Sequence, residues 1–156
     1  MEQTRHFTAT VYVVSDGAVA LHEPEGLEMW LPPGGHLDRD ELPHEAALRE
    51  VREEIGQDVD LLAEADGVES PTVEPLPEPQ HFQLADVNVC DGEATHQHID
   101  YVFYARGESR AIDPADGEVP ATEWAWFDSE TLHERAEELE PDVVEIALDA
   151  IDAVQA

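Results

Sequence analysis

Residues 43–55 carry the pattern that most constrains what this chain can fold into. Pro43 suits the first turn of a helix, and Gly56 suits the position just after its last turn. Because successive helical residues turn by about 100°, an apolar stripe runs along one side of this segment and can pack on a sheet. That stripe consists of Leu48, Val51 and Ile55. The segment therefore predicts an amphipathic helix that lies against a sheet.

Three carboxylates occupy a second face of this predicted helix. Relative to Glu50, Glu54 lies about 40° to one side and Glu53 about 60° to the other. Like charges at i,i+4 repel by about 0.2–0.5 kcal/mol, and a hard divalent cation with oxygen ligands would reverse that sign. Ala46 and Ala47 lie one turn earlier on this side, where we expect them to leave room for a loop, a metal or a substrate.

A solvated acidic surface is the competing interpretation, because acids dominate the composition. The chain has 156 residues, with 38 Asp and Glu against 7 Lys and Arg, and a net charge of −31. All of these basic residues are arginine. Such self-repulsion is screened only at high salt, since the Debye length falls to about 3 Å at 1 M. We therefore expect a halophilic, salt-accumulating source, and we exclude nucleic-acid and anionic-membrane partners because no basic patch can form.

The spacing around the helix favours a specific family. Residues 35–57 read GHLDRDELPHEAALREVREEIGQ. This segment resembles the signature of the Nudix hydrolases, the MutT-type pyrophosphohydrolases, which is G-x5-E-x7-R-E-U-x-E-E-x-G-U with U aliphatic. Every fixed polar and glycine position is present, and one position departs, because Gln57 stands where an aliphatic residue is usual. The preceding WLPPGG at 30–35 also resembles the family's entry to this signature.

The resemblance implies a Nudix-type α/β/α sandwich with a mixed sheet, and a role for each matched residue. Arg49 would orient the glutamates, and Glu41 would hold Arg49 in turn. Glu50 would bind metal, activate the attacking water as a base, or do both. The metal-binding set that the resemblance implies is the Gly34 carbonyl, Glu50, Glu53 and Glu54.

A further acid is expected from a loop outside the signature, as in many members of this family. In MutT-like sequences a glutamate lies six residues before a tryptophan that begins a late strand. Glu118 precedes Trp124 by six residues in GEVPATEW, so we expect Glu118 to serve as a ligand or base. Its neighbours Asp113, Asp116 and Glu123 are the rival candidates.

The implied activity is Mg²⁺-dependent hydrolysis of a pyrophosphate bond in a nucleoside diphosphate linked to another moiety, with Mn²⁺ as a substitute ion. The alternatives are a nucleoside triphosphate pyrophosphohydrolase that sanitises nucleotides, and a non-catalytic module that senses them. The complete glutamate set argues against the sensor. The expected partner is a small-molecule nucleotide, and a homodimer is left open. An anionic substrate needs cations here, since the chain has so few basic residues.

Apolar alternation elsewhere predicts the strands around this helix. The order of elements favours a single α/β domain over residues 1–156, with helices on both sides of a mixed sheet. The proline-rich segment 70–80 predicts a loop or extended connector. Expected strands are 5–14 and 17–22 as one hairpin, 58–66, 81–90 and 97–105 as a second hairpin, and 123–128, and expected helices are 128–140 and 141–154.

His96, His98 and Asp100 alternate along one predicted strand, so they share a face of the sheet. Imidazoles with a carboxylate would suit zinc, but a structural zinc site needs four ligands and the chain has no cysteine pair. We therefore expect these residues to line the substrate cleft or to make sheet-surface contacts. Trp30 is a candidate for stacking on a base.

The single cysteine bears on where the protein works. With Cys90 alone, no disulfide can form within the chain, which is typical of a cytoplasmic protein. The chain also has no run of 18 or more apolar residues, and its first residues lack the pattern of a signal peptide. We therefore expect a cytoplasmic location and no membrane partner.

Overall fold

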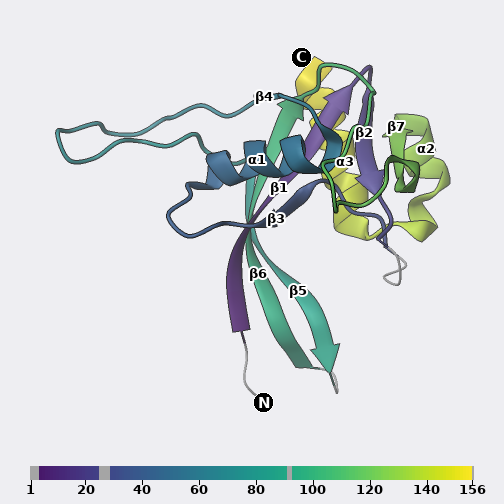
Figure 1. The fold of residues 1–156 in the computed structure, drawn as a ribbon, viewed down its shortest axis with the longest axis horizontal. Coiled ribbons are helices and arrows are strands. Elements are labelled where there is room, and N and C mark those ends of the chain that lie inside the picture. Colours follow the sequence, from purple (N-terminus) through teal and green to yellow (C-terminus); the bar gives the residue numbers. More distant parts are fainter. Residues whose placement is uncertain (1–3, 25–28, 91–92, 156) are drawn as a thin grey trace.

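A computed structural model describes residues 4–24, 29–90 and 93–155 and shows a mixed sheet between helices (Figure 1). Within these ranges no helix is both long and apolar enough to cross a bilayer. The strands are β1 (Thr4–Ser15), β2 (Ala18–His22), β3 (Gly34–His36), β4 (Asp60–Leu61), β5 (His81–Cys90), β6 (Glu93–Arg106) and β7 (Trp124–Asp128). The helices are α1 (Pro43–Ile55), α2 (Ser129–Glu134) and α3 (Pro141–Gln155), with short 3₁₀ turns η1 (Ala121–Glu123) and η2 (Ala136–Glu138).

Strand β1 organises the sheet. It pairs in parallel with β6 and antiparallel with both β2 and β3. Strand β7 continues the sheet beyond β2, whereas β4 and β5 pair with β6. The parallel register sets His6 opposite His98, and the β3 register sets Thr8 opposite His36. Directly opposed residues present their side chains on the same face, so these registers decide which distant residues meet.

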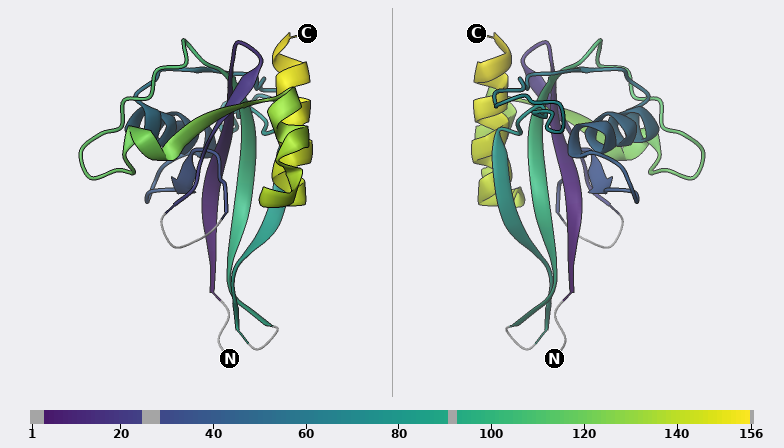
Figure 2. Two further views of the ribbon diagram at one scale, coloured as in Figure 1. Left: turned by 90° about the vertical axis from the view of Figure 1, so that its right-hand side faces the viewer. Right: turned by 90° about the vertical axis from the view of Figure 1, so that its left-hand side faces the viewer.

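Helices α1 and α3 cover opposite faces of the sheet, as Figure 2 shows. Because side chains alternate along a strand, Val11 and Val13 of β1 face α1, whereas Tyr12 and Val14 face α3. The α/β/α sandwich with a mixed sheet is therefore confirmed. Buried residues of α1 that pack on the sheet are Ala46, Ala47, Val51 and Ile55, and those of α3 are Val143, Ile146, Ala147, Ala150 and Ile151.

Helix α1 has the predicted bounds, but one expectation about it is wrong. It ends at Gly56, whose φ of 72° is a left-handed conformation that favours glycine. Ala46 and Ala47 are fully buried in the core between α1 and the sheet, so they do not line open space beside the glutamates. Their small side chains instead fill the interface between the helix and β1, which leaves no room for a substrate there.

Two other elements are shorter than the sequence predicts. Segment 58–66 pairs with β6 only at Asp60–Leu61, because β5 pairs with β6 between Glu93 and Val102. The helix expected at 128–140 ends at Glu134 and is followed by η2, since Arg135 leaves the helix with its guanidinium over two aromatic rings. The proline-rich connector between β4 and β5 projects away from the sheet (Figure 1). The turn of the second hairpin, residues 91–92, lies outside the described ranges.

Candidate active site

The backbone of β3 lies directly against the carboxylates of α1. The N–H of Gly34 donates to Oε2 of Glu54 over 2.8 Å. Gly35 lies so close to Glu50 that an added Cβ would stand 2.5 Å from Oε1 of that glutamate. Position 35 therefore needs glycine for close approach, and the two glycines bring a strand end and a helix face together.

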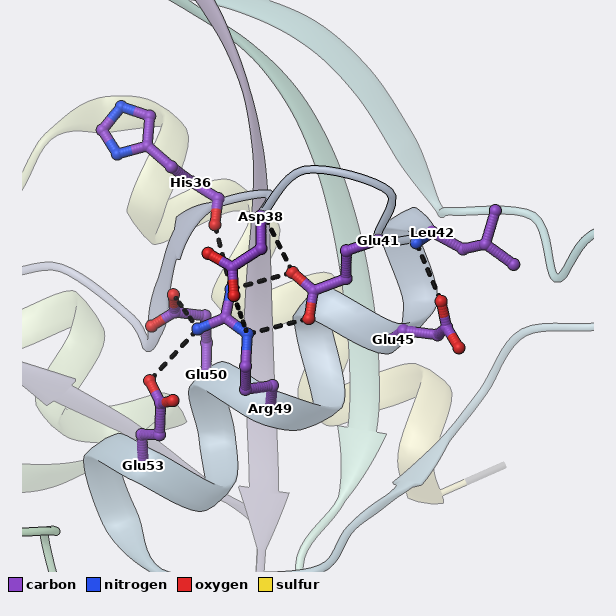
Figure 3. A network of polar contacts seen from close by, with 8 residues as sticks. All are labelled: His36, Asp38, Glu41, Leu42, Glu45, Arg49, Glu50 and Glu53. Atoms are coloured by element: carbon purple, nitrogen blue, oxygen red, sulfur yellow. Dashed lines mark hydrogen bonds and ion pairs between the residues drawn. The ribbon is translucent and has the colours of Figure 1, made fainter.

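Arg49 ties the carboxylates together, as Figure 3 shows. Its Nε and Nη2 donate to the two oxygens of Glu41 at 2.8 and 2.9 Å, in a bidentate pair. Its Nη1 donates to Glu50 at 2.9 Å and to Glu53 at 3.1 Å, and Nη2 also reaches the carbonyl of His36 at 3.0 Å. The bond from Arg49 lowers the pKa of Glu41, and the pKa of Arg49 is raised by the same bond. Such charge-assisted bidentate contacts fix the guanidinium in one orientation.

Burial and mutual repulsion raise the pKa of two carboxyls in this group. Burial raises the pKa of Glu54 to about 8, and the charges of Glu50, Glu118 and Glu53 add to the effect. Burial also raises the pKa of Glu50, although its bond from Arg49 acts in the opposite direction. Half-buried carboxylates that repel one another are an oxygen-only donor set, which fits a hard divalent cation such as Mg²⁺. A cation held between them would offset both burial and repulsion.

The loop between β6 and β7 is anchored to the C-terminal end of α1. The N–H of Asp113 donates to the carbonyl of Ile55 at 2.9 Å, and the N–H of Ala115 donates to the carbonyl of Glu53 at 2.8 Å. The last carbonyls of a helix have no partner within it, so the loop satisfies two of them. These bonds bring the loop against the end of the helix that carries the glutamates.

Gln57 fixes the first part of the same loop. This side chain is 4% exposed, and its Nε2 donates to the carbonyls of Ser109 and Ala111, both at 2.9 Å. Its Oε1 accepts from the N–H of Glu108 at 3.0 Å. The departure from the family pattern therefore exchanges an apolar contact for a buried amide with three hydrogen bonds to the loop.

Glu118 follows in this anchored loop and lies near the carboxylates. Its charge is among those that raise the pKa values of Glu50 and Glu54. The rival acids Asp113, Asp116 and Glu123 are not among the main causes of either shift. Of the four candidates, Glu118 is thus the one whose charge acts most clearly on the glutamates of α1.

Two other predicted candidates do not join the carboxylates. Trp30 packs edge-on against Phe127, with ring centres 5.1 Å apart, in the core on the α3 side of the sheet. Asp100 is buried and accepts hydrogen bonds from Thr8 at 2.8 Å and Thr10 at 2.9 Å. Its burial raises its pKa. Both residues are occupied by contacts within the fold, on the face opposite α1.

His96 and His98 also lie on the face opposite α1. They share a face as the alternation predicts, with ring centres 5.1 Å apart. Two further histidines that the sequence did not single out, His6 and His36, join them through the registers of β1 with β6 and β3. A strand register between distant segments leaves no local pattern, so no signal in this sequence pointed to the group.

The sequence and the fold match a known family. The model of the NUDIX domain matches residues 4–146. A hydrolase of the NUDIX family from Clostridium perfringens is 32% identical, with a TM-score of 0.80 over 97% of this chain and 99% of that chain.

More distant structures support the fold alone. A NUDIX hydrolase from Nitrosomonas europaea is 21% identical, with a TM-score of 0.62 over 96% of this chain and 90% of that chain. The dihydroneopterin triphosphate pyrophosphohydrolase of E. coli is 15% identical, with a TM-score of 0.58 over 100% of both chains. No match was found among curated proteins.

Proposed function

Because this chain belongs to the Nudix family of hydrolases, we propose that it hydrolyses the pyrophosphate bond of a nucleoside diphosphate linked to another moiety, in a Mg²⁺-dependent reaction. The observation that carries this proposal is the group formed by Glu50, Glu53 and Glu54, hereafter the carboxylate cluster. Arg49 donates to two of its members, and the Gly34 N–H donates to the third. The cluster combines a buried oxygen donor set with a rigid support.

Each residue of the site has a proposed task. The carboxylate cluster and the Gly34 carbonyl would hold divalent ions. When bound, such ions neutralise the diphosphate, polarise a phosphoryl oxygen and lower the pKa of the attacking water. Arg49, itself fixed by Glu41, keeps the carboxylates in place as positioning residue. The ions would thus neutralise the charge of the substrate, and Arg49 would hold the carboxylates in the geometry that binds the ions.

Two carboxylates are the candidates that we propose for accepting the proton of the attacking water. Glu50 belongs to the cluster itself, and Glu118 approaches it from the anchored loop. The water would attack phosphorus in line, and the P–O bond to the leaving phosphate would break as its oxygen takes up the electron pair. Glu118 is exposed, whereas Glu50 is half-buried and accepts a hydrogen bond from Arg49, so the two acids differ in their access to solvent.

The acidic composition of the chain also bears on the salt concentration at which the enzyme works. A net charge of −31 and only seven arginines leave the phosphate groups of a substrate without basic partners over most of the surface. We propose that the enzyme works in a salt-rich cytoplasm, where the repulsion between protein and substrate is screened. Activity and melting temperature should both rise between low and molar KCl.

A turnover screen tests the proposed function. The protein is incubated at molar KCl with Mg²⁺, Mn²⁺ or EDTA and with nucleotide sugars, dinucleotides and nucleoside triphosphates, and the products are separated by anion exchange. We expect Mg²⁺-dependent release of a nucleoside monophosphate and the phosphorylated second moiety, with Mn²⁺ as a substitute. Glu53→Gln is the inactive control: it removes one carboxylate charge of the cluster at nearly constant shape, so it should lose the Mg²⁺-dependent turnover.

Other outcomes of the screen contradict the proposal in distinct ways. Cleavage restricted to triphosphates, with release of pyrophosphate, would identify a nucleotide-sanitising enzyme instead. Tight nucleotide binding without turnover of any substrate would identify a sensor. Equal turnover in EDTA and in Mg²⁺ would remove the metal dependence.

A further inference from the structure

Four imidazoles gather on the sheet face opposite the carboxylate cluster. They come from three strands, with His6 on β1, His36 on β3 and His96 and His98 on β6. Consecutive ring centres around the group are 5.2 Å (His6–His36), 5.0 Å (His36–His98), 5.1 Å (His98–His96) and 4.8 Å (His96–His6) apart. None of these residues has a task in the proposed hydrolysis, so the group needs its own explanation.

Two of the three spacings within His36, His96 and His98 match those of imidazoles around one metal ion, whereas the ring centres of His36 and His96, 6.3 Å apart, would have to approach each other. With Zn–N bonds of about 2.0–2.1 Å, the ring centres of two imidazoles on a tetrahedral ion lie about 5 Å apart. Ring nitrogens of His36, His96 and His98 all lie within 4.8 Å of one another. Nitrogens on a shared tetrahedral ion are about 3.4 Å apart, so side-chain rotations that close the group by about 1 Å would complete the site.

The hydrogen-bonding state of the ring nitrogens also fits a ligand role. Within the described part of the chain, Nε2 of His98 is buried and has no hydrogen-bond partner. A buried polar atom without a partner is costly, and a bound ion would satisfy it. Nδ1 of His96 is hydrogen-bonded with the hydroxyl of Thr4 over 2.8 Å, which leaves Nε2 of that ring to bind. A ligand histidine held through its other nitrogen is the usual arrangement at metal sites.

We propose that His36, His96 and His98, hereafter the histidine cluster, bind a transition-metal ion of the zinc class. Imidazole nitrogen suits Zn²⁺, Ni²⁺ and Cu²⁺, whereas Mg²⁺ prefers oxygen, so this site and the carboxylate cluster would select different ions. Three protein nitrogens with a fourth position for water or for the adjacent His6 is an accepted zinc geometry. His36 is exposed and borders a cavity of about 420 Å³ that also contacts His6 and Glu41, which gives an ion a way in.

An ion at this place would connect the two faces of the sheet. It would tie β3 to β6 across β1, since His36 belongs to the first and the other two ligands to the second. The carbonyl of the same His36 accepts from Nη2 of Arg49, at 3.0 Å. The ion would therefore stabilise the strand end against which the carboxylate cluster is built, without contacting substrate.

Metal titration of the untagged protein tests the proposal. Zn²⁺ binding is measured by calorimetry at molar KCl with excess Mg²⁺, so that carboxylates are already occupied, and Co²⁺ serves as a spectroscopic substitute. We expect one equivalent of Zn²⁺ to bind, and the visible spectrum of Co²⁺ to be that of a four-coordinate nitrogen site. His36→Asn and His98→Asn should each weaken Zn²⁺ binding by at least about a hundredfold.

The control variants separate this site from the rest of the acidic surface. His133→Asn removes an exposed histidine of α2 and should leave the affinity unchanged. The double variant Glu53→Gln, Glu54→Gln should also bind one equivalent of Zn²⁺, because it alters only the carboxylate cluster. The proposal is wrong if the unmodified protein binds no equivalent above Mg²⁺, or if Co²⁺ shows a six-coordinate oxygen spectrum. The proposal would also be overturned if the double variant no longer bound Zn²⁺, or if both histidine variants still bound Zn²⁺ normally.

Discussion

The carboxylate cluster and the histidine cluster occupy opposite faces of one sheet, and they differ in how the chain assembles them. A single helix supplies the first from positions only four residues apart, whereas β3 and β6 supply the second from residues 60 or more positions apart. Strand β3 serves both, because side chains alternate along it. Gly35 meets Glu50 on one face, and His36 meets His98 on the other. Function can thus be built from local geometry or from strand register within the same fold.

The largest expected effect separates the two clusters by function. Glu54→Gln should lower kcat/KM for the Mg²⁺-dependent reaction by about a thousandfold, equivalent to about 4 kcal/mol of transition-state stabilisation. The reason is that Gln keeps the hydrogen bond from Gly34 but lacks the charge that a divalent ion needs. Steady-state kinetics at saturating Mg²⁺ measure the change, and zinc calorimetry on the same preparation checks that the histidine cluster is intact.

The control for this variant removes an acid outside the site. Glu145→Gln on α3 changes the net charge by the same amount and should keep full activity. A similar loss in both variants would mean that net charge, and not the carboxylate cluster, decides turnover.

The same contrast explains what the sequence could predict. Helix α1, its glycine stop and its face of glutamates follow from the 100° period within one segment, so the sequence located them correctly. Glu118 was expected from the family resemblance, through its spacing to Trp124, and its charge helps to raise the pKa of Glu54. The clustering of His36 with His98 depended on two strand registers, which no local pattern specifies.

One error and one omission have equally specific physical causes. Ala46 and Ala47 were placed beside the glutamates by angle alone, but the angle does not say how close a sheet approaches, and both are buried. Gln57 was seen only as a departure from an aliphatic position. Its three hydrogen bonds to residues 108–111 could not be foreseen, because its partners are backbone groups of a loop about fifty residues away.

An intermediate effect is expected at Arg49, which contacts the carboxylate cluster and also the backbone of His36. Arg49 donates to Glu41, to the carboxylate cluster and to the carbonyl of His36, and a lysine cannot span these partners with one ammonium. Arg49→Lys should lower kcat about 10–100-fold with a smaller change in KM, because positioning is lost while the metal ligands remain. Kinetics over a range of Mg²⁺ concentrations should also show that Arg49→Lys lowers the affinity for Mg²⁺ less than Glu54→Gln does.

The matched control for Arg49→Lys is on the same helix. Arg52 forms an exposed ion pair with Asp58 at 2.8 Å, and its side chain is 59% exposed. Arg52→Lys should therefore retain activity within about twofold, as expected for surface pairs. If both lysine variants lose the same activity, the network drawn in Figure 3 has no special role.

The last expected effect is a pair of opposite pH dependences in the metal-free protein. Burial raises the pKa of Glu54 to about 8 from an ordinary 4.5, so the folded state holds the proton more tightly than the unfolded chain. Burial, with neighbouring histidines, lowers the pKa of His98 to about 4 from 6.5, so here the unfolded chain binds the proton more tightly. By linkage, Glu54 makes stability fall as pH rises from about 4.5 to 8, and His98 makes it rise from about 4 to 6.5.

Urea denaturation in EDTA and molar KCl, repeated from pH 4.5 to 8.5, resolves the two slopes. Relative to the unmodified protein, Glu54→Gln should be progressively stabilised toward pH 8.5. His98→Asn should lack the rise in stability that His98 gives the unmodified protein as the pH increases to 6.5. Differences between variants cancel the titration of groups common to both, such as His22, whose pKa is also lowered to about 4 by burial. Parallel slopes in the two variants would mean that the clusters do not titrate independently, and that the sheet does not isolate one face from the other.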